Sequence, residues 1–205
     1  MSDVLRVHWT ITPANAPEPW LNCSRCRDTT RFRANGKIRV NANGKRLDAW
    51  LIYKCTSCDN TWNRPIVERK HVSTIDPHIL ASLQANDPEL SRRLAFEKWP
   101  RKLKVMHFDD ATVRKQVMLE GAGPAGRLEI VCVVPETTGL RVDRLLATEL
   151  RLSRSRIRSM QDAGHLVACP DGLHRPLRDG LRVTIDLRNV HDRDGIAFAV
   201  TGREA

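Results

Sequence analysis

Two pairs of cysteines have the spacing of a metal site. Cys23 and Cys26 form one C-x2-C pair, and Cys55 and Cys58 form a second. Each pair can present two thiolates to one ion, so the two pairs complete the tetrahedral shell that Zn²⁺ prefers. Disulfides would need an oxidising compartment, and a redox C-x2-C pair usually occurs once, so both are weaker interpretations. We predict one structural Zn²⁺ ion held by these four cysteines.

The other two cysteines have no such partners. Cys132 lies inside the apolar run 128–134, where a small core residue is expected. Cys169 precedes Pro170 in a predicted loop and is assigned no role. Because four thiolates leave Zn²⁺ no open position, and a catalytic zinc normally keeps a water ligand, the predicted role of the metal is structural.

A second group of chemically informative residues lies in the last third of the chain. Apolar residues at helical spacing predict a helix over 142–150, and Ser153 is a candidate N-cap for a second helix that ends at Gly164. Short strands are expected at 165–167 and 181–185. Both predicted helices begin among arginines.

This order of elements resembles the RNA-binding domain shared by ribosomal protein S-four, some pseudouridine synthases and a small heat-shock ribosome-binding protein. The resemblance spans residues 139–187. It rests on the motifs Arg141-x-Asp143-Arg144-x-Leu146, Ser153-Arg154-Ser155-Arg156, Gly164-His165-x-Val167 and Gly180. In that family the starts of both helices face RNA. The resemblance therefore implies RNA contacts from Arg141, Arg144, Ser153, Arg154, Ser155 and Arg156.

Arg158 joins this candidate RNA surface for a physical reason. It lies four residues after Arg154, so both guanidinium groups share one helix face and repel each other slightly. A bound phosphate would relieve that repulsion, and the free N–H groups at the helix start favour an anion. An exposed basic helix with no ligand is the alternative interpretation.

The segment between the cysteine pairs predicts a β-hairpin that brings them together. Asn43-Gly44 is a strong two-residue turn signal between the alternating stretch 37–41 and the strand-forming stretch 47–53. Further strands are expected at 5–11 and 61–67. We group these elements as a zinc ribbon.

Many basic residues flank the predicted ribbon, and two interpretations of them are open. They could form a phosphate-binding face, with Trp50 or Trp62 available to stack on bases. Alternatively, they form a solvated outer face, with the tryptophans packed inside. The basic residues are Arg25, Arg27, Arg31, Arg33, Lys37, Arg39, Lys45, Arg46 and Lys54.

The middle of the chain predicts two short helices. Asp76-Pro77 and Asp87-Pro88 are both N-cap signals, Asn86 is suited to end the first helix, and Trp99 continues the apolar stripe of the second. A β-hairpin is expected next, with strands at 114–119 and 128–134 joined by a glycine-rich loop. That loop has neither the P-loop ending nor the dinucleotide-binding spacing.

Charge is distributed unevenly along the sequence. The chain has 205 residues, 34 Lys and Arg against 24 Asp and Glu, and a formal charge of +10. The excess is +7 in residues 1–70, zero in 71–138 and +3 in 139–205. Such a balance favours a polyanionic partner, most often nucleic acid. No apolar run is long enough for a spanning helix, and residues 1–6 lack a signal-peptide pattern, so we expect a cytoplasmic protein without a membrane partner.

The sequence therefore predicts an α+β protein in three parts: a zinc ribbon (1–70), a helical hairpin (71–105), and a β-hairpin followed by the RNA-binding-like domain (106–205). The whole chain, including 41–48 and 84–87, also resembles a family of bacterial proteins defined by this ribbon, for which no activity is established.

We expect a non-catalytic, zinc-containing RNA-binding protein associated with the ribosome or another structured RNA. A DNA-binding or protein-interaction module is the first alternative. An RNA-modifying enzyme is the second, although the sequence offers no nucleophile with its base, no paired-carboxylate motif and no cofactor loop.

Overall fold

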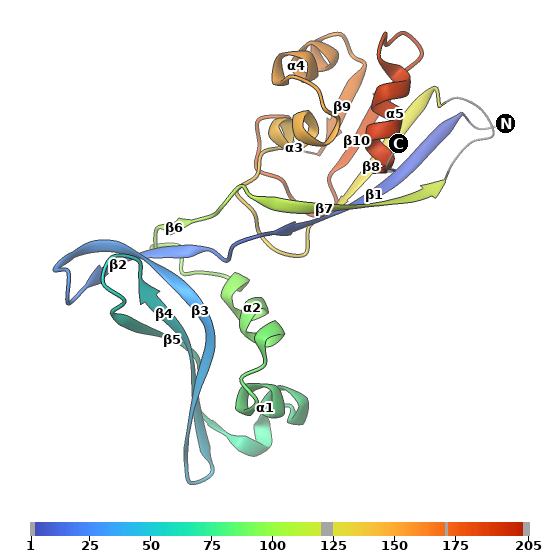
Figure 1. Ribbon diagram of the computed structural model, residues 1–205. Coiled ribbons are helices and arrows are strands. Elements are labelled where there is room, and N and C mark those ends of the chain that lie inside the picture. Colours follow the sequence, from blue (N-terminus) through green and yellow to red (C-terminus); the bar gives the residue numbers. More distant parts are fainter. Residues whose placement is uncertain (1–2, 120–124, 171, 203–205) are drawn as a thin grey trace. The chain divides into compact units, whose positions relative to one another are not determined.

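The computed structural model describes residues 3–119, 125–170 and 172–202 (Figure 1). The glycine-rich loop predicted before residue 126 lies mostly outside this range. The chain divides into two compact units. Residues 16–107 form what we call the inserted unit. Residues 1–15 and 108–205 form the split unit, whose two segments flank the inserted unit in sequence. The predicted class, α+β, is confirmed, but these boundaries differ from the three predicted parts.

A five-stranded sheet in the order β5-β4-β3-β2-β6 forms the frame of the inserted unit. Its strands are β2 (Glu18–Cys23), β3 (Asp28–Asn43), β4 (Arg46–Cys55), β5 (Thr61–His71) and β6 (Val105–Met106). The predicted turn at Asn43-Gly44 joins β3 to β4, and Gly44 has a φ of +60°. Only glycine adopts that backbone conformation without steric cost, so the turn residue fits its place.

Two helices and a 3-10 turn complete the inserted unit: η1 (Val72–Thr74), α1 (Pro77–Gln84) and α2 (Pro88–Phe96). Both predicted N-caps are confirmed, because Asp76 and Asp87 each accept hydrogen bonds from the first backbone amides of their helix. Asn86 has a φ of +53°, and its side chain accepts a hydrogen bond from the Ile38 amide. The helices pack on β3 and β4 through Leu83, Leu90 and Leu94.

Helix α2 is shorter than predicted, and Trp99 lies beyond its end. The backbone leaves the helix at Glu97. Arg64, only 9% exposed, donates hydrogen bonds to the carbonyl oxygens of Leu94, Glu97 and Lys98. Arg64 thus supplies donors to carbonyl groups in the last turn of α2 and just beyond it. Trp99 packs over the Arg64 guanidinium, 3.9 Å from the ring centre, instead of extending the helical stripe.

The split unit contains the second five-stranded sheet, in the order β7-β1-β8-β10-β9 (Figure 1). Its strands are β1 (Val4–Pro13), β7 (Ala111–Leu119), β8 (Arg127–Val133), β9 (Leu166–Cys169) and β10 (Arg182–Asp186). Strand β1 runs antiparallel to β7 and parallel to β8. Its alternating apolar residues, including Val7 and Trp9, are fully buried.

Two predictions about strand partners are wrong. The strand expected at 5–11 was grouped with the ribbon, but β1 pairs only within the split unit among the described residues. Strands β7 and β8 were expected to form a hairpin, yet β1 lies between them. The physical reason is the same in both cases. Strands β7 and β8 pair with the two edges of β1, and the apolar face of β1 then joins those of its neighbours under the helices in one continuous core.

Three helices, α3 (Val142–Glu149), α4 (Arg154–Asp162) and α5 (Arg193–Thr201), pack on one face of this sheet (Figure 1). Their buried residues, such as Leu146, Ile157 and Ile196, join the strand residues in a single apolar cluster. Helix α5 was not predicted. The predicted stop at Gly164 is confirmed by its φ of +74°. None of the described helices combines the length and hydropathy needed to cross a membrane.

Formal charge separates more sharply by unit than by sequence segment. The inserted unit holds 18 Lys and Arg against 9 Asp and Glu, a net charge of +9. The split unit holds 16 against 15, a net charge of +1. The smaller unit therefore accounts for nearly all of the basic excess.

Candidate metal centre and arginine cluster

The four predicted cysteine ligands meet at one end of the inserted unit. Cys23 ends β2 and Cys55 ends β4, and each is followed by a tight turn that carries the second cysteine of its pair. The two turns are alike. The amide of Arg27 donates to the Cys23 carbonyl at 2.8 Å, and that of Asp59 donates to the Cys55 carbonyl at 3.0 Å. Both residues have a φ of +58°.

The sulfur atoms are close enough to share one ion. All four Sγ atoms lie within 4.8 Å of one another. Cys23 Sγ is 3.6 Å from Cys58 Sγ, and Cys26 Sγ is 3.9 Å from Cys55 Sγ. Tetrahedral Zn–S bonds of about 2.3 Å would place sulfur atoms about 3.8 Å apart. The donor set and its geometry therefore suit a tetrahedral, thiolate-preferring metal ion.

Neighbouring groups stabilise two of the thiolates. The Cys26 amide, the largest influence, lowers the pKa of Cys23 by donating to its sulfur at 3.4 Å. Burial raises the pKa of Cys55, but hydrogen bonds from Thr30 and the Ser57 amide outweigh it and bring the pKa to about 6. Thr30 Oγ1 lies 3.1 Å from Cys55 Sγ.

The remaining cysteines stay apart from this centre. Cys132 is fully buried in the split unit, paired with Trp9 across β1 and β8. Burial raises the pKa of its thiol to about 12, which keeps the thiol protonated and matches the predicted core role. Cys169 is exposed at the end of β9.

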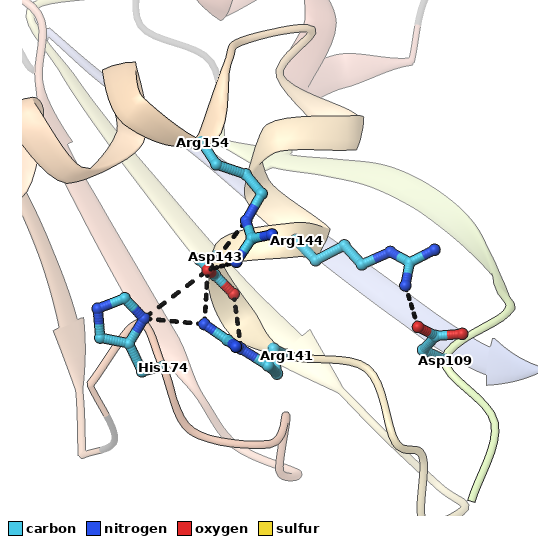
Figure 2. A network of polar contacts seen from close by, with 6 residues as sticks. All are labelled: Asp109, Arg141, Asp143, Arg144, Arg154 and His174. Atoms are coloured by element: carbon cyan, nitrogen blue, oxygen red, sulfur yellow. Dashed lines mark hydrogen bonds and ion pairs between the residues drawn. The ribbon is translucent and has the colours of Figure 1, made fainter.

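Two of the predicted RNA residues, Arg141 and Arg154, contact a buried carboxylate to which the sequence analysis assigned no role. Asp143, in the first turn of α3, has a side chain only 5% exposed. Arg141 contacts both of its oxygens, at 3.1 and 2.8 Å. Arg154, at the start of α4, donates two hydrogen bonds to Oδ2, at 3.2 and 2.9 Å (Figure 2). One carboxylate thus holds a guanidinium group from the start of each helix.

His174 completes this cluster from the loop after β9. Its Nδ1 lies 2.9 Å from Arg141 Nη2 and 3.7 Å from Asp143 Oδ2 (Figure 2). Burial raises the pKa of Asp143, but the hydrogen bond from Arg154 and the charge of Arg141 together lower it by more. The pKa therefore lies below its usual value. Asp143 is therefore ionised at neutral pH, and its charge offsets that of one arginine.

The other candidate RNA residues fall into two groups. Arg144 projects away from Asp143 and forms an ion pair with Asp109 (Figure 2). Ser153 is confirmed as the N-cap of α4, where its Oγ accepts a hydrogen bond from the Arg156 amide at 3.1 Å, and it also contacts Ser155. Arg156 and Arg158 are exposed, and their side chains have no hydrogen bond or ion pair to other described residues.

A similar carboxylate lies in the inserted unit. Glu18, only 1% exposed, contacts two arginines of β3: Arg33 Nε lies 2.7 Å from Oε1 and Arg31 Nη1 lies 3.2 Å from Oε2. Arg31 and Arg33 alternate on one face of β3, since the intervening Phe32 is buried. No sequence signal marked Glu18. Asp143 is part of the motif Arg141-x-Asp143-Arg144, but folding brings two of its partners, Arg154 and His174, near it.

The two tryptophans considered for stacking have different environments. Trp62 packs with Tyr53 and Trp99, with ring centres 5.5 and 6.4 Å apart, so it belongs to the core side of the sheet. Trp50 is partly exposed and belongs to neither apolar cluster of the described chain. The structure therefore supports the packed interpretation for Trp62 and leaves Trp50 on the outer face.

Comparison with known proteins gives a family. Searches among curated proteins and among solved structures found no match. A family model described as "Protein of unknown function (DUF1062)" matches residues 40–171 and includes the second cysteine pair, α3 and α4. Because this match covers more than half of its 205 residues, the chain belongs to the DUF1062 family.

Proposed function

We propose that the protein is a non-catalytic, zinc-containing RNA-binding protein whose split unit binds structured RNA. The observation that carries this proposal is the orientation of the Arg141 and Arg154 guanidinium groups by buried Asp143. Their side chains remain 43% and 57% exposed, so both keep N–H groups available to solvent. An arginine already held in place loses less conformational entropy on meeting a phosphate.

Residues on α4 extend this surface. Arg158 lies one helical turn beyond Arg154, and Arg156 is exposed near the helix start. The order of α3, α4, β9 and β10 matches the order on which the resemblance to the RNA-binding domain of ribosomal protein S-four rests. Together these features favour a phosphate-contacting surface over an unliganded basic helix.

Zinc is the metal that best fits the four-cysteine cluster. Four sulfur donors in tetrahedral arrangement, buried or half-buried, suit a closed structural site. When bound, the ion would supply cross-linking of the two cysteine turns. Since the thiolates must stay reduced to bind it, we also propose a cytoplasmic location.

The test is salt-dependent binding of a stem-loop RNA by the metal-loaded full chain. We expect binding at 50 mM salt to weaken steeply by 200 mM, because phosphate contacts release counterions. The double variant Arg156→Gln/Arg158→Gln should reduce the slope of log K against log salt by up to about 2. Arg193→Gln, an exposed arginine on α5, is the matched control and should keep the wild-type slope.

Two results would reject this function. One is the absence of stem-loop binding by the metal-loaded wild type at 50 mM salt. The other is an unchanged slope in the double variant. Displacement of the RNA by an equal concentration of duplex DNA would instead support the DNA-binding alternative.

A further inference from the structure

The sheet of the inserted unit has one face without helices, which we call the outer ribbon face. Strand register places Arg39 opposite Trp50 and Trp50 opposite Pro65. In the same way, Arg33 lies opposite Lys54. Directly opposed residues of antiparallel strands point to the same side, so these five residues and Arg46 share the outer ribbon face. The helices pack on the other face, with buried residues such as Leu51 and Tyr53.

Trp50 is the unusual member of this face. All five tryptophans lie in described segments. Trp9 is buried, Trp20 lies under Lys104, and Trp62 and Trp99 stack on each other. Trp50 has no aromatic or cationic partner among the described residues, and it belongs to neither apolar cluster, although Pro65 and Ile52 lie beside it on the same face. Core packing therefore does not account for an aromatic residue at this position.

The charges around Trp50 are mostly positive and partly held in place. Arg33 is oriented by Glu18, Lys54 donates to Thr61 Oγ1 at 2.6 Å, and Arg46 donates to the Arg69 carbonyl at 3.1 Å. Arg39, directly across from Trp50, is exposed and has no hydrogen bond or ion pair to other described residues. Asp48 is the acidic residue on the β4 part of this face, and one of its oxygens accepts from the Arg69 amide.

We propose that the outer ribbon face binds a short segment of single-stranded RNA, with one base stacked on Trp50 and the neighbouring phosphates on Arg39 and Lys54. A stacking aromatic within a positively charged groove or face is the usual arrangement for sequence-tolerant binding of single strands. From Arg46 to Lys54 the strand spans about 26 Å, enough for several nucleotides. The choice of RNA over DNA rests on the function proposed above.

The test measures binding of a fluorescein-labelled 12-residue oligouridylate, which has no stable secondary structure, by fluorescence anisotropy. The protein is the metal-loaded full chain at 50 mM salt. Trp50→Ala should weaken binding roughly tenfold, the loss expected for one stacked base. Trp50→Phe keeps an aromatic face and should stay within about threefold of the wild type. Arg39→Gln should reduce the salt slope by about 0.7, the value for one phosphate on a single strand.

Controls separate this site from general effects of charge and folding. Arg93→Gln removes an exposed arginine from α2, on the helical side of the same unit, and should bind as the wild type does. The metal content of each variant shows whether the inserted unit is intact. If Trp50→Ala fails to bind metal, the comparison of Trp50→Phe with Trp50→Leu replaces it, with the loss expected only for leucine.

Three outcomes would overturn the proposal: no oligouridylate binding by the wild type, unchanged affinity after loss of the aromatic ring at position 50, or equal or tighter binding of a matched oligothymidylate. Stem-loop binding is recorded for the same samples. Loss of stem-loop binding with retained oligouridylate binding would reject only the function proposed for the split unit, so the two failures are distinguishable.

Discussion

The inserted and split units both hold an arginine pair on a buried carboxylate, but the two units differ in net charge. Glu18 orients Arg31 and Arg33 in a unit with a net charge of +9, and Asp143 orients Arg141 and Arg154 in a unit of +1. Because the split unit has almost no net charge, a surface that binds an anion there would have to depend on how its arginines are oriented. In the inserted unit it could also use excess charge.

The two units also differ in what stabilises them. The split unit has one large apolar cluster that joins both its segments, including Trp9, Leu128 and Val183. The inserted unit has a smaller cluster, together with four cysteines that could hold a metal ion. Small units often need a metal or disulfides because they bury too little apolar surface. This contrast leads to four predictions, from the largest expected effect to the smallest.

Removal of the metal should affect the inserted unit far more than the split unit. Structural Zn²⁺ contributes about 10–16 kcal/mol of binding free energy in zinc-finger peptides, so even partial coupling to folding is a large effect. Hydrogen exchange of the full chain, with and without a chelator, measures both units at once. Amides of β3 and β4 should lose protection, whereas those of β1 and β8 should keep it. Equal loss in both units, or in neither, would contradict the prediction.

Trp9→Ala should destabilise the split unit far more than the inserted unit, the reverse of metal removal. Trp9 is fully buried, and its Nε1 donates to the Val200 carbonyl at 3.0 Å. Truncation of a buried tryptophan costs about 3–5 kcal/mol. We expect loss of exchange protection in β1, β8 and α5, with one metal ion still bound per chain. Loss of the metal in this variant would show that the two units do not unfold separately.

Neutralising each buried carboxylate compares the two arginine pairs directly. Glu18→Gln and Asp143→Asn should each lower the stability of their own unit by about 1–3 kcal/mol, because charged hydrogen-bond partners lose their counter-charge. Denaturant unfolding followed by exchange protection assigns the loss to a unit. Asp194→Asn, at an exposed pair with Arg193, is the control and should leave stability nearly unchanged. A similar loss of stability in the control variant would contradict the prediction, because burial of the carboxylate would then make no difference.

The contribution of Asp143 to the acid titration should be the smallest effect, and it belongs to the split unit. The pKa of Asp143 is lowered, because the effects of Arg154 and Arg141 exceed that of burial. A carboxyl group with a lowered folded pKa contributes its stability above its ordinary value of about 4 and loses it as pH falls through the folded value. The stability difference between wild type and Asp143→Asn should therefore be constant from pH 7 to about 5 and shrink below pH 4. A difference that does not change with pH would contradict the assignment.

Local chemistry was the part of the structure that could be predicted. Asp76, Asp87 and Ser153 cap helices through bonds that span only two or three residues, so the sequence is sufficient to locate them. The Asn43-Gly44 turn brings β3 and β4 together, and this hairpin returns the second cysteine pair to the first. The caps, the turn and the spacing within each cysteine pair all depend on positions close together in the chain.

Long-range partners could not be predicted in the same way. The alternation in β1 fixes which of its residues are buried, but it does not specify that β7 and β8 are its neighbours. Asp143 lowers the net charge of the arginine-rich region in any count of the sequence. Its orienting role becomes visible only when Arg154 and His174 are placed around it (Figure 2).

The central position of β1 has a consequence for synthesis on the ribosome. Strand β1 is made first, but its neighbours β7 and β8 follow only after residues 110 and 126. The inserted unit can close its own sheet in the meantime, since its described strands pair only with each other. Strand β1 therefore has no partner strand and an uncovered apolar face until more than half of the chain has emerged. We expect the split unit to be the later one to fold and the one that depends on protection of the nascent chain.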